Sequence, residues 1–134
     1  FAIREAIRRA MEEAAKNREP IDGIVIAGDF NLVGSPNIVD LAAEGLDLDR
    51  SPLLAAPLYG IDGLSNLTWR DGGSEFMPGQ LDFLLFSDSR LDLADGMVID
   101  PAAILPRGAT ADGPSDHLPI IADLRWKAMA ERRR

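Results

Sequence analysis

The sequence has 134 residues, of which 14 are Lys or Arg and 22 are Asp or Glu, so the formal net charge is −8. Apolar residues make up 46% and charged residues 27%, a balance typical of a single globular domain and not of a disordered chain. No apolar run is long enough to span a membrane, and the absence of Cys excludes disulfides and thiolate metal sites. A metal would therefore depend on carboxylates, amides or the single His, and the composition indicates no cellular compartment.

The charge is unevenly distributed along the chain. Residues 1–18 carry a net +2 and residues 125–134 a net +4, whereas residues 19–124 carry a net −14. This acidic central region should repel duplex DNA, because proteins gain most of their affinity for DNA by neutralising its phosphates with basic side chains. It suits divalent cations, or a small phosphoester that arrives with its metal. Solubility alone is the alternative explanation.

The first part of the chain predicts a helix, a strand and a second helix. Residues 2–17 place apolar side chains at helical spacing. Residues 24–27 form a short apolar run rich in β-branched side chains, which is typical of a buried strand. Residues 36–43 predict a short helix with Ser35 as its N-cap and Pro36 at its first position.

The rest of the chain predicts strands joined by long loops. Strands are expected at residues 67–70, 80–86, 91–99 and 118–124. Loops are expected at residues 47–66, 71–79 and 101–114, with a charged C-terminal tail at 125–134. This order of elements indicates a mixed α/β layer whose functional residues lie on loops.

A first motif, Gly28-Asp29-Phe30-Asn31, follows at the end of the first expected strand. Asp29 and Asn31 are two residues apart, so on an extended backbone their side chains point the same way. A carboxylate can hold a hard cation or take a proton, and an amide can donate to a phosphate oxygen. The alternative is an Asx-type turn that only ends the strand.

A second motif, Ser115-Asp116-His117, contains the only His of the chain. A neutral imidazole accepts a proton near neutral pH, and its cation stabilises a phosphorane oxygen. Asp116 is suited to take a metal-bound water or a second metal. The alternative is a surface loop with a solvated His.

The third motif is an acidic residue, Asp82, inside the apolar run from Leu81 to Phe86. A buried carboxylate without a partner is costly. His117 is the nearest chemical candidate, since a carboxylate that accepts from one ring nitrogen fixes the tautomer and orients the other nitrogen at a substrate. The alternatives are a local hydrogen bond to the backbone and an Asp that faces water from an edge strand.

Thr68, Trp69 and Arg70 precede the strand that carries Asp82. Trp69 fits a core residue or a site wall better than a platform for stacking bases. Arg70 is a candidate for contacting a phosphate, with a surface ion pair as the alternative. We therefore expect Arg70, together with Asn31, to bind substrate.

Taken in order, Gly28-Asp29-Phe30-Asn31, Thr68-Trp69 with Gln80-Leu81-Asp82-Phe83, and Ser115-Asp116-His117 resemble the endonuclease/exonuclease/phosphatase superfamily with its DNase I-like fold. The resemblance covers about residues 22–124. It implies an α/β fold, namely the C-terminal half of a four-layer α/β sandwich, with a mainly antiparallel sheet and helices on one side. It also implies metal-dependent phosphoester hydrolysis by an in-line water.

The resemblance gives each motif residue an expected role. Asp29 matches the family Asp that acts on the nucleophilic water or a metal, and Asn31 matches the Asn that contacts the phosphate. Asp82 matches the Asp that orients the catalytic His, which is His117. Asp116 matches the metal-linked Asp. The expected catalytic residues are thus Asp29, Asn31, Asp82 and His117, and the expected metal ligands are Asp29 and Asp116.

The implied cofactor is Mg²⁺ or Mn²⁺, with one principal ligand, a Glu, in the N-terminal half of the family domain. The Glu residues near the start of this chain lie on or beside the expected first helix. We therefore expect residues 1–134 to be a partial domain, the C-terminal catalytic portion of a metal-dependent phosphodiesterase, nuclease or phosphatase, with the N-terminal half missing. The isolated chain is expected to be inactive.

The expected partners are a phosphoester substrate and the missing N-terminal half. The sequence does not decide between a small molecule, a lipid and a nucleic acid as the substrate. Without its partner sheet the isolated chain would expose one sheet face, so we expect it to form a homodimer. The alternative function is a non-catalytic half-domain that binds or assembles.

Overall fold

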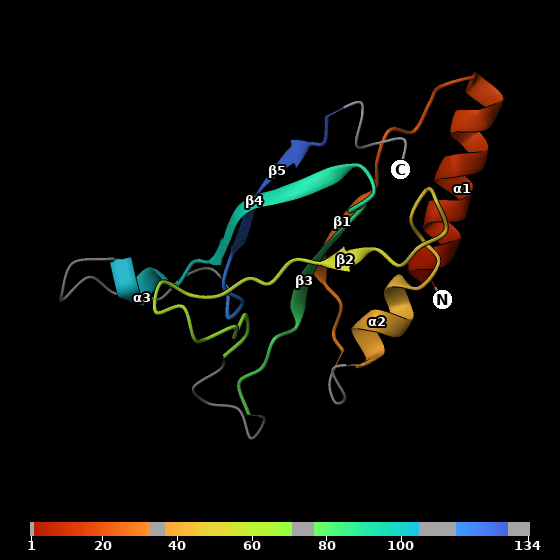
Figure 1. Ribbon diagram of the computed structural model, residues 1–134. Coiled ribbons are helices and arrows are strands. Elements are labelled where there is room, and N and C mark those ends of the chain that lie inside the picture. The colour runs from red at the N-terminus through yellow and green to blue at the C-terminus, as the bar shows by residue number, and fades with distance from the viewer. Residues whose placement is uncertain (1, 33–36, 71–76, 105–114, 129–134) are drawn as a thin grey trace.

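A computed structural model gives the arrangement of the chain and describes residues 2–32, 37–70, 77–104 and 115–128 (Figure 1). The elements, in chain order, are α1 (Ala2–Asn17), β1 (Val25–Asp29), α2 (Asn37–Ala43), β2 (Leu54–Ala55), β3 (Asp82–Phe86), β4 (Leu91–Val98), α3 (Pro101–Ile104) and β5 (Ile120–Trp126). The strands form two antiparallel sheets, one with the order β1-β3-β2 and one made of β4 and β5. The α/β class and the antiparallel pairing expected from the sequence are confirmed. Within the described ranges, no helix is both long enough and apolar enough to cross a membrane.

The first helix is confirmed over its expected length. Arg8 forms ion pairs with Glu5 and Glu12 at the three- and four-residue spacings that stabilise a helix. Arg4 reaches away from α1, and its guanidinium donates to the backbone carbonyl of Glu44 at 2.6 Å. Arg4 thus links α1 to the segment that follows α2, and the two helices lie on the same side of the molecule in Figure 1.

Core residues pack against both faces of the central strand β3. Leu85, which is 0% exposed, packs with Val39 and Ala43 of α2 on one face. Phe86, which is 1% exposed, packs on the opposite face with Leu91 and other apolar residues of the β4–β5 pair. The three-stranded sheet is therefore a middle layer between α2 and the second sheet, which explains the continuous apolar run of β3.

The expectation of a buried strand at residues 24–27 is wrong for β1. This strand lies at the edge of its sheet and is largely exposed, with Val25 at 50%. An apolar run indicates a strand by its residue types, but its burial depends on which elements cover it.

The exposed apolar side chains on the strands do not form the single exposed sheet face expected for this chain, because Val25 and Leu54 pair with Phe86 and share its face. Side chains on the Phe86 face of β3 are covered by β4 and β5. Large apolar side chains remain exposed at Val25, Leu54, Ile121 and Trp126. The homodimer expected from such a surface stays a prediction.

Three segments differ from the expected loops and strands. The expected loop at residues 47–66 contains β2, which pairs with the C-terminal part of β3. The expected strand at 67–70 is reduced to single-residue bridges of Trp69 with Gly79 and His117. The short helix α3 begins the expected loop at 101–114. For β2 and Trp69, pairing with distant segments decides the structure, whereas α3 begins with local hydrogen bonds to Asp100.

Two expected segments, the start of the second helix and the C-terminal tail, are described only in part. α2 begins at Asn37, so the proposed cap Ser35 and first residue Pro36 lie outside the described residues. The expected charged tail at 125–134 is wrong at its start, because Arg125 and Trp126 belong to β5 and pair with β4. Residues 129–134 of that tail lie outside the described residues.

Candidate active site

The register of β1 and β3 brings two of the expected site residues together. Asp29, the last residue of β1, lies opposite Asp82, the first residue of β3. The backbone N–H of Phe30 donates to the carbonyl of Leu81 at 2.9 Å and continues this pairing by one residue. Two carboxylates that are 53 positions apart in the numbering therefore meet at one end of the sheet.

The chain turns sharply just after Asp29. Asn31 has φ of 49°, in the left-handed region, and its backbone N–H donates to Oδ1 of Asp29 at 2.7 Å. The extended geometry expected from the two-residue spacing is therefore wrong at Asn31, and the Asx-type turn considered as the alternative is present. Asn tolerates this conformation better than most residues. The turn orients the carboxylate of Asp29 while its side chain remains exposed.

Asp82 and His117 form the pair expected from the sequence. Nδ1 of His117 lies 2.7 Å from Oδ2 of Asp82, with side chains that are 28% and 14% exposed. An ionised carboxylate only accepts hydrogen bonds, so Nδ1 carries the proton and Nε2 is the nitrogen left for a substrate. The side chain of Ser115 accepts the backbone N–H of His117 at 3.1 Å and helps to shape this segment.

The charges around His117 favour its protonated form. The hydrogen bond to Asp82 is the largest cause that raises the pKa of His117 above its ordinary value, and partial burial opposes it. The negative charges of Asp82, Asp29 and Asp116 raise this pKa further. The carboxylates of Asp82, Asp29 and Asp116 thus all favour the charged form of this imidazole.

Thr68 connects the two segments that carry Asp82 and His117. Its side chain is completely buried, and its Oγ1 accepts the backbone N–H groups of Leu81 and Asp82, both at 2.9 Å. Its carbonyl accepts the backbone N–H of Leu118 at 2.6 Å. The sequence analysis did not predict this bridging role of Thr68. The local hint was a polar Thr next to Trp69, ahead of the strand that carries Asp82.

Replacement of Thr68 by Val should destabilise the protein, because Val keeps the shape but removes the acceptor of two buried N–H groups. The expected loss in the free energy of unfolding is about 1–3 kcal/mol. Urea unfolding followed by circular dichroism measures it. Thr68→Ser keeps the hydroxyl and serves as the control, and equal losses for Val and Ser would contradict the bridging role.

Asp116 also has a specific partner. Nε1 of Trp69 donates to Oδ2 of Asp116 at 2.7 Å. Asp116 itself is exposed, and the indole is half-buried. This contact fits the expectation that Trp69 is a wall of the site.

Arg70 is drawn into an ion pair. Its guanidinium contacts the carboxylate of Asp100 next to α3, and the Arg70 side chain is 44% exposed. The surface ion pair considered as the alternative is thus present. Exposed pairs of this kind are worth about 0–1 kcal/mol, so the contact is weak enough to be exchanged for a phosphate. The substrate role of Arg70 stays a prediction.

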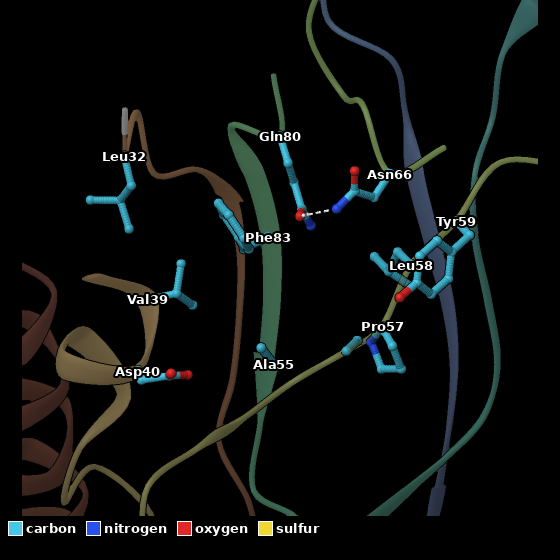
Figure 2. A pocket seen from close by; sticks show the side chains of 11 residues that line it. Leu32, Val39, Asp40, Ala55, Pro57, Leu58, Tyr59, Asn66, Gln80 and Phe83 are labelled. Atoms are coloured by element: carbon cyan, nitrogen blue, oxygen red, sulfur yellow. Dashed lines mark hydrogen bonds between the residues drawn. The ribbon is translucent and has the colours of Figure 1, made fainter. Parts of the chain in front are cut away.

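A pocket of about 480 Å³ borders the start of β3. Its lining residues are Leu32, Val39, Asp40, Ala55, Ala56, Pro57, Leu58, Tyr59, Asn66, Gln80 and Phe83. Figure 2 shows the amide of Asn66 donating to Gln80, at 2.9 Å, between the apolar walls. None of these described lining residues is basic.

The two expected metal ligands fit Mg²⁺ or Mn²⁺ by their chemistry. Asp29 and Asp116 are exposed and offer oxygen atoms, and Mg²⁺ commonly binds through one or two carboxylates, waters and substrate phosphates. Among the residues that the structure describes, no group of three or more His, Cys, Asp or Glu side chains is placed to hold a metal ion.

Comparison with known proteins gives one match. The model of the Endonuclease/Exonuclease/phosphatase family matches residues 4–117, which is most of the chain. The chain belongs to this family. Members of the Endonuclease/Exonuclease/phosphatase family are in general metal-dependent phosphoesterases, and the α/β fold with antiparallel sheets agrees with their DNase I-like fold. No curated protein and no solved structure matches the chain significantly.

Proposed function

We propose that this chain carries the catalytic His and two metal-associated carboxylates of a Mg²⁺- or Mn²⁺-dependent phosphoesterase. The observation that carries the proposal is the Asp82–His117 pair with Asp29 and Asp116 acting on the same imidazole. A solvated surface His without a catalytic role needs no acidic partners. Here three carboxylates from three separate segments act on one imidazole. Membership in the Endonuclease/Exonuclease/phosphatase family supports the same reaction class.

In the proposed reaction a water attacks phosphorus and the bond from phosphorus to the leaving oxygen breaks. Asp82 accepts the Nδ1 proton of His117 in a hydrogen bond and so fixes the ring orientation. Because its pKa is raised, His117 is suited to act as a cation that donates from Nε2 to a phosphoryl oxygen. Asp29 is suited to orient or deprotonate the attacking water, and Asn31 to donate to the phosphate.

Asp29 and Asp116 would hold the metal, which when bound neutralises charge on the phosphate and lowers the pKa of a bound water. Two carboxylates leave most coordination positions to water and phosphate oxygens. We therefore also propose that a further acidic ligand comes from the N-terminal half of the family domain, outside these 134 residues. The 134-residue chain alone should then hydrolyse phosphoesters poorly, as expected from the sequence.

The test uses the full-length product of the gene that encodes this chain. We expect it to hydrolyse at least one ester in a panel of bis(p-nitrophenyl) phosphate, p-nitrophenyl phosphate, single-stranded DNA and sphingomyelin vesicles in the presence of Mg²⁺. EDTA and His117→Ala should each reduce the rate to background, and added Mg²⁺ should restore the EDTA-treated enzyme. The ester hydrolysed fastest identifies the substrate class.

Two results would contradict the proposal. One is hydrolysis that survives both EDTA and His117→Ala, since neither the metal nor the His would then be needed. The other is a folded full-length protein that hydrolyses none of the esters at millimolar Mg²⁺ or Mn²⁺, which would favour a binding or assembly role.

A further inference from the structure

The indole N–H of Trp69 forms a polar contact. This N–H, which can only donate, lies 2.7 Å from Oδ2 of Asp116, 47 residues further along the chain. A hydrogen bond to an ionised carboxylate is stronger than one between neutral groups. The indole therefore constrains a side chain that would otherwise rotate freely at the surface.

The backbone of Trp69 is itself fixed on two sides. On one side it exchanges hydrogen bonds with Gly79, at 3.0 and 3.1 Å, and on the other side it bridges to His117. The backbone N–H of Arg70 donates to the carbonyl of Asp116 at 3.2 Å, so the two segments are held together beside the indole. The indole position is consequently set by the fold and not by the Asp116 contact alone.

We propose that Trp69 is a positioning residue for Asp116 in metal binding. Its N–H holds Oδ2 and fixes the rotamer of the carboxylate, which leaves Oδ1 to face Mg²⁺ or Mn²⁺. In the described part of the chain no other side chain donates to this carboxylate. Carboxylates that bind metals are generally held by such an outer hydrogen bond, and its loss weakens metal affinity by about 10–100-fold. This inference rests on the proposed function.

The matched substitution is Trp69→Phe, which keeps an aromatic side chain and removes the N–H. In the full-length enzyme we expect the Mg²⁺ concentration for half-maximal activity to rise about 10–100-fold, with little change in kcat at saturating Mg²⁺. A merely structural Trp would lower kcat or stability at every Mg²⁺ concentration. Trp126→Phe removes the other Trp of the chain, on β5, and should leave the Mg²⁺ requirement unchanged.

A second measurement does not depend on activity. The full-length protein is labelled with ¹⁵N-tryptophan and titrated with Mn²⁺, which broadens nearby NMR signals. The indole signal of Trp69, assigned as the one absent from Trp69→Phe, should broaden at lower Mn²⁺ than that of Trp126. Asp116→Asn should remove this difference.

The outcomes separate this inference from the proposed function. If Asp116→Asn raises the Mg²⁺ requirement but Trp69→Phe does not, the positioning role of Trp69 is wrong and the proposed function stands. Equal broadening of the Trp69 and Trp126 signals would mean that Mn²⁺ does not bind beside Asp116, which overturns the metal role of Asp116 and this inference with it. If neither substitution nor EDTA affects hydrolysis, the proposed function fails first.

Discussion

Replacement of Asp82 by Asn should lower the pKa of His117 and reduce the proposed phosphoester hydrolysis, in a full-length protein that contains this domain, by roughly 10²–10⁴, the usual contribution of positioned acid–base groups. Asn has nearly the shape of Asp but no charge. It replaces the charged acceptor of the hydrogen bond, which is the largest cause of the raised pKa, by a neutral amide oxygen. An NMR titration of the imidazole signal of His117, the only His among these 134 residues, measures the shift, and steady-state kinetics measure the rate.

The same substitution should change how stability depends on pH. The folded protein holds the pKa of His117 above its ordinary value of 6.5. The protonated pair therefore stabilises the fold below about pH 6.5, and this contribution is lost as the pH rises through the folded pKa. The difference in unfolding free energy between the wild type and Asp82→Asn should then be larger near about pH 5.5 than near about pH 9.

Asp123→Asn is the matched control for both measurements. Asp123 is an exposed residue of β5 whose carboxylate pairs with Arg125. It changes the net charge by the same amount but should leave the His117 titration and the rate within about twofold, since exposed ion pairs contribute little. An unchanged titration of His117 in Asp82→Asn would show that the two residues are not coupled.

Replacement of Phe86 by Ala should remove a large part of the stability of the protein. Phe86 is 1% exposed and packs with Leu58, Leu84, Leu91 and Val98 between the two sheets. Truncating a buried Phe costs about 3–5 kcal/mol, because apolar contacts are lost and a cavity remains. Domains are stable by only about 5–15 kcal/mol in total. Thermal and urea unfolding should therefore show a much lower midpoint.

Val25→Ala provides the control for Phe86→Ala. Val25 lies directly opposite Phe86 in the β1–β3 pairing but is 50% exposed. Its truncation should cost less than about 1 kcal/mol. Equal losses at the two positions would mean that the layer between β3 and the β4–β5 pair is not the main core.

The Asp82–His117 pair could be predicted from the sequence because a buried carboxylate without a partner costs free energy. An acidic residue inside an apolar strand requires a partner, and the chain offers one His. The helix α1 was predictable because its apolar residues recur at helical spacing, and the strand β3 because it is a short continuous apolar run.

The features that the sequence did not reveal all depend on contacts between distant segments. β2 consists of two residues in a Pro-rich stretch and exists only because β3 offers it an edge. Thr68 reaches β3 through its side chain and His117's segment through its carbonyl, and no local pattern encodes such a bridge. The exposure of β1 follows from its place at the sheet edge, which residue types do not specify.

The left-handed backbone at Asn31 restricts what can be learned by substituting this residue. Most side chains disfavour this conformation by about 1–2 kcal/mol, whereas Gly adopts it freely and Asn and Asp tolerate it. Asn31→Ala would therefore combine the loss of an amide with a strained turn, and it would also disturb the N–H that orients Asp29. Gly and Asp keep the turn and change only the side-chain chemistry. The backbone alone therefore limits position 31 to a few residue types, whatever the substrate is.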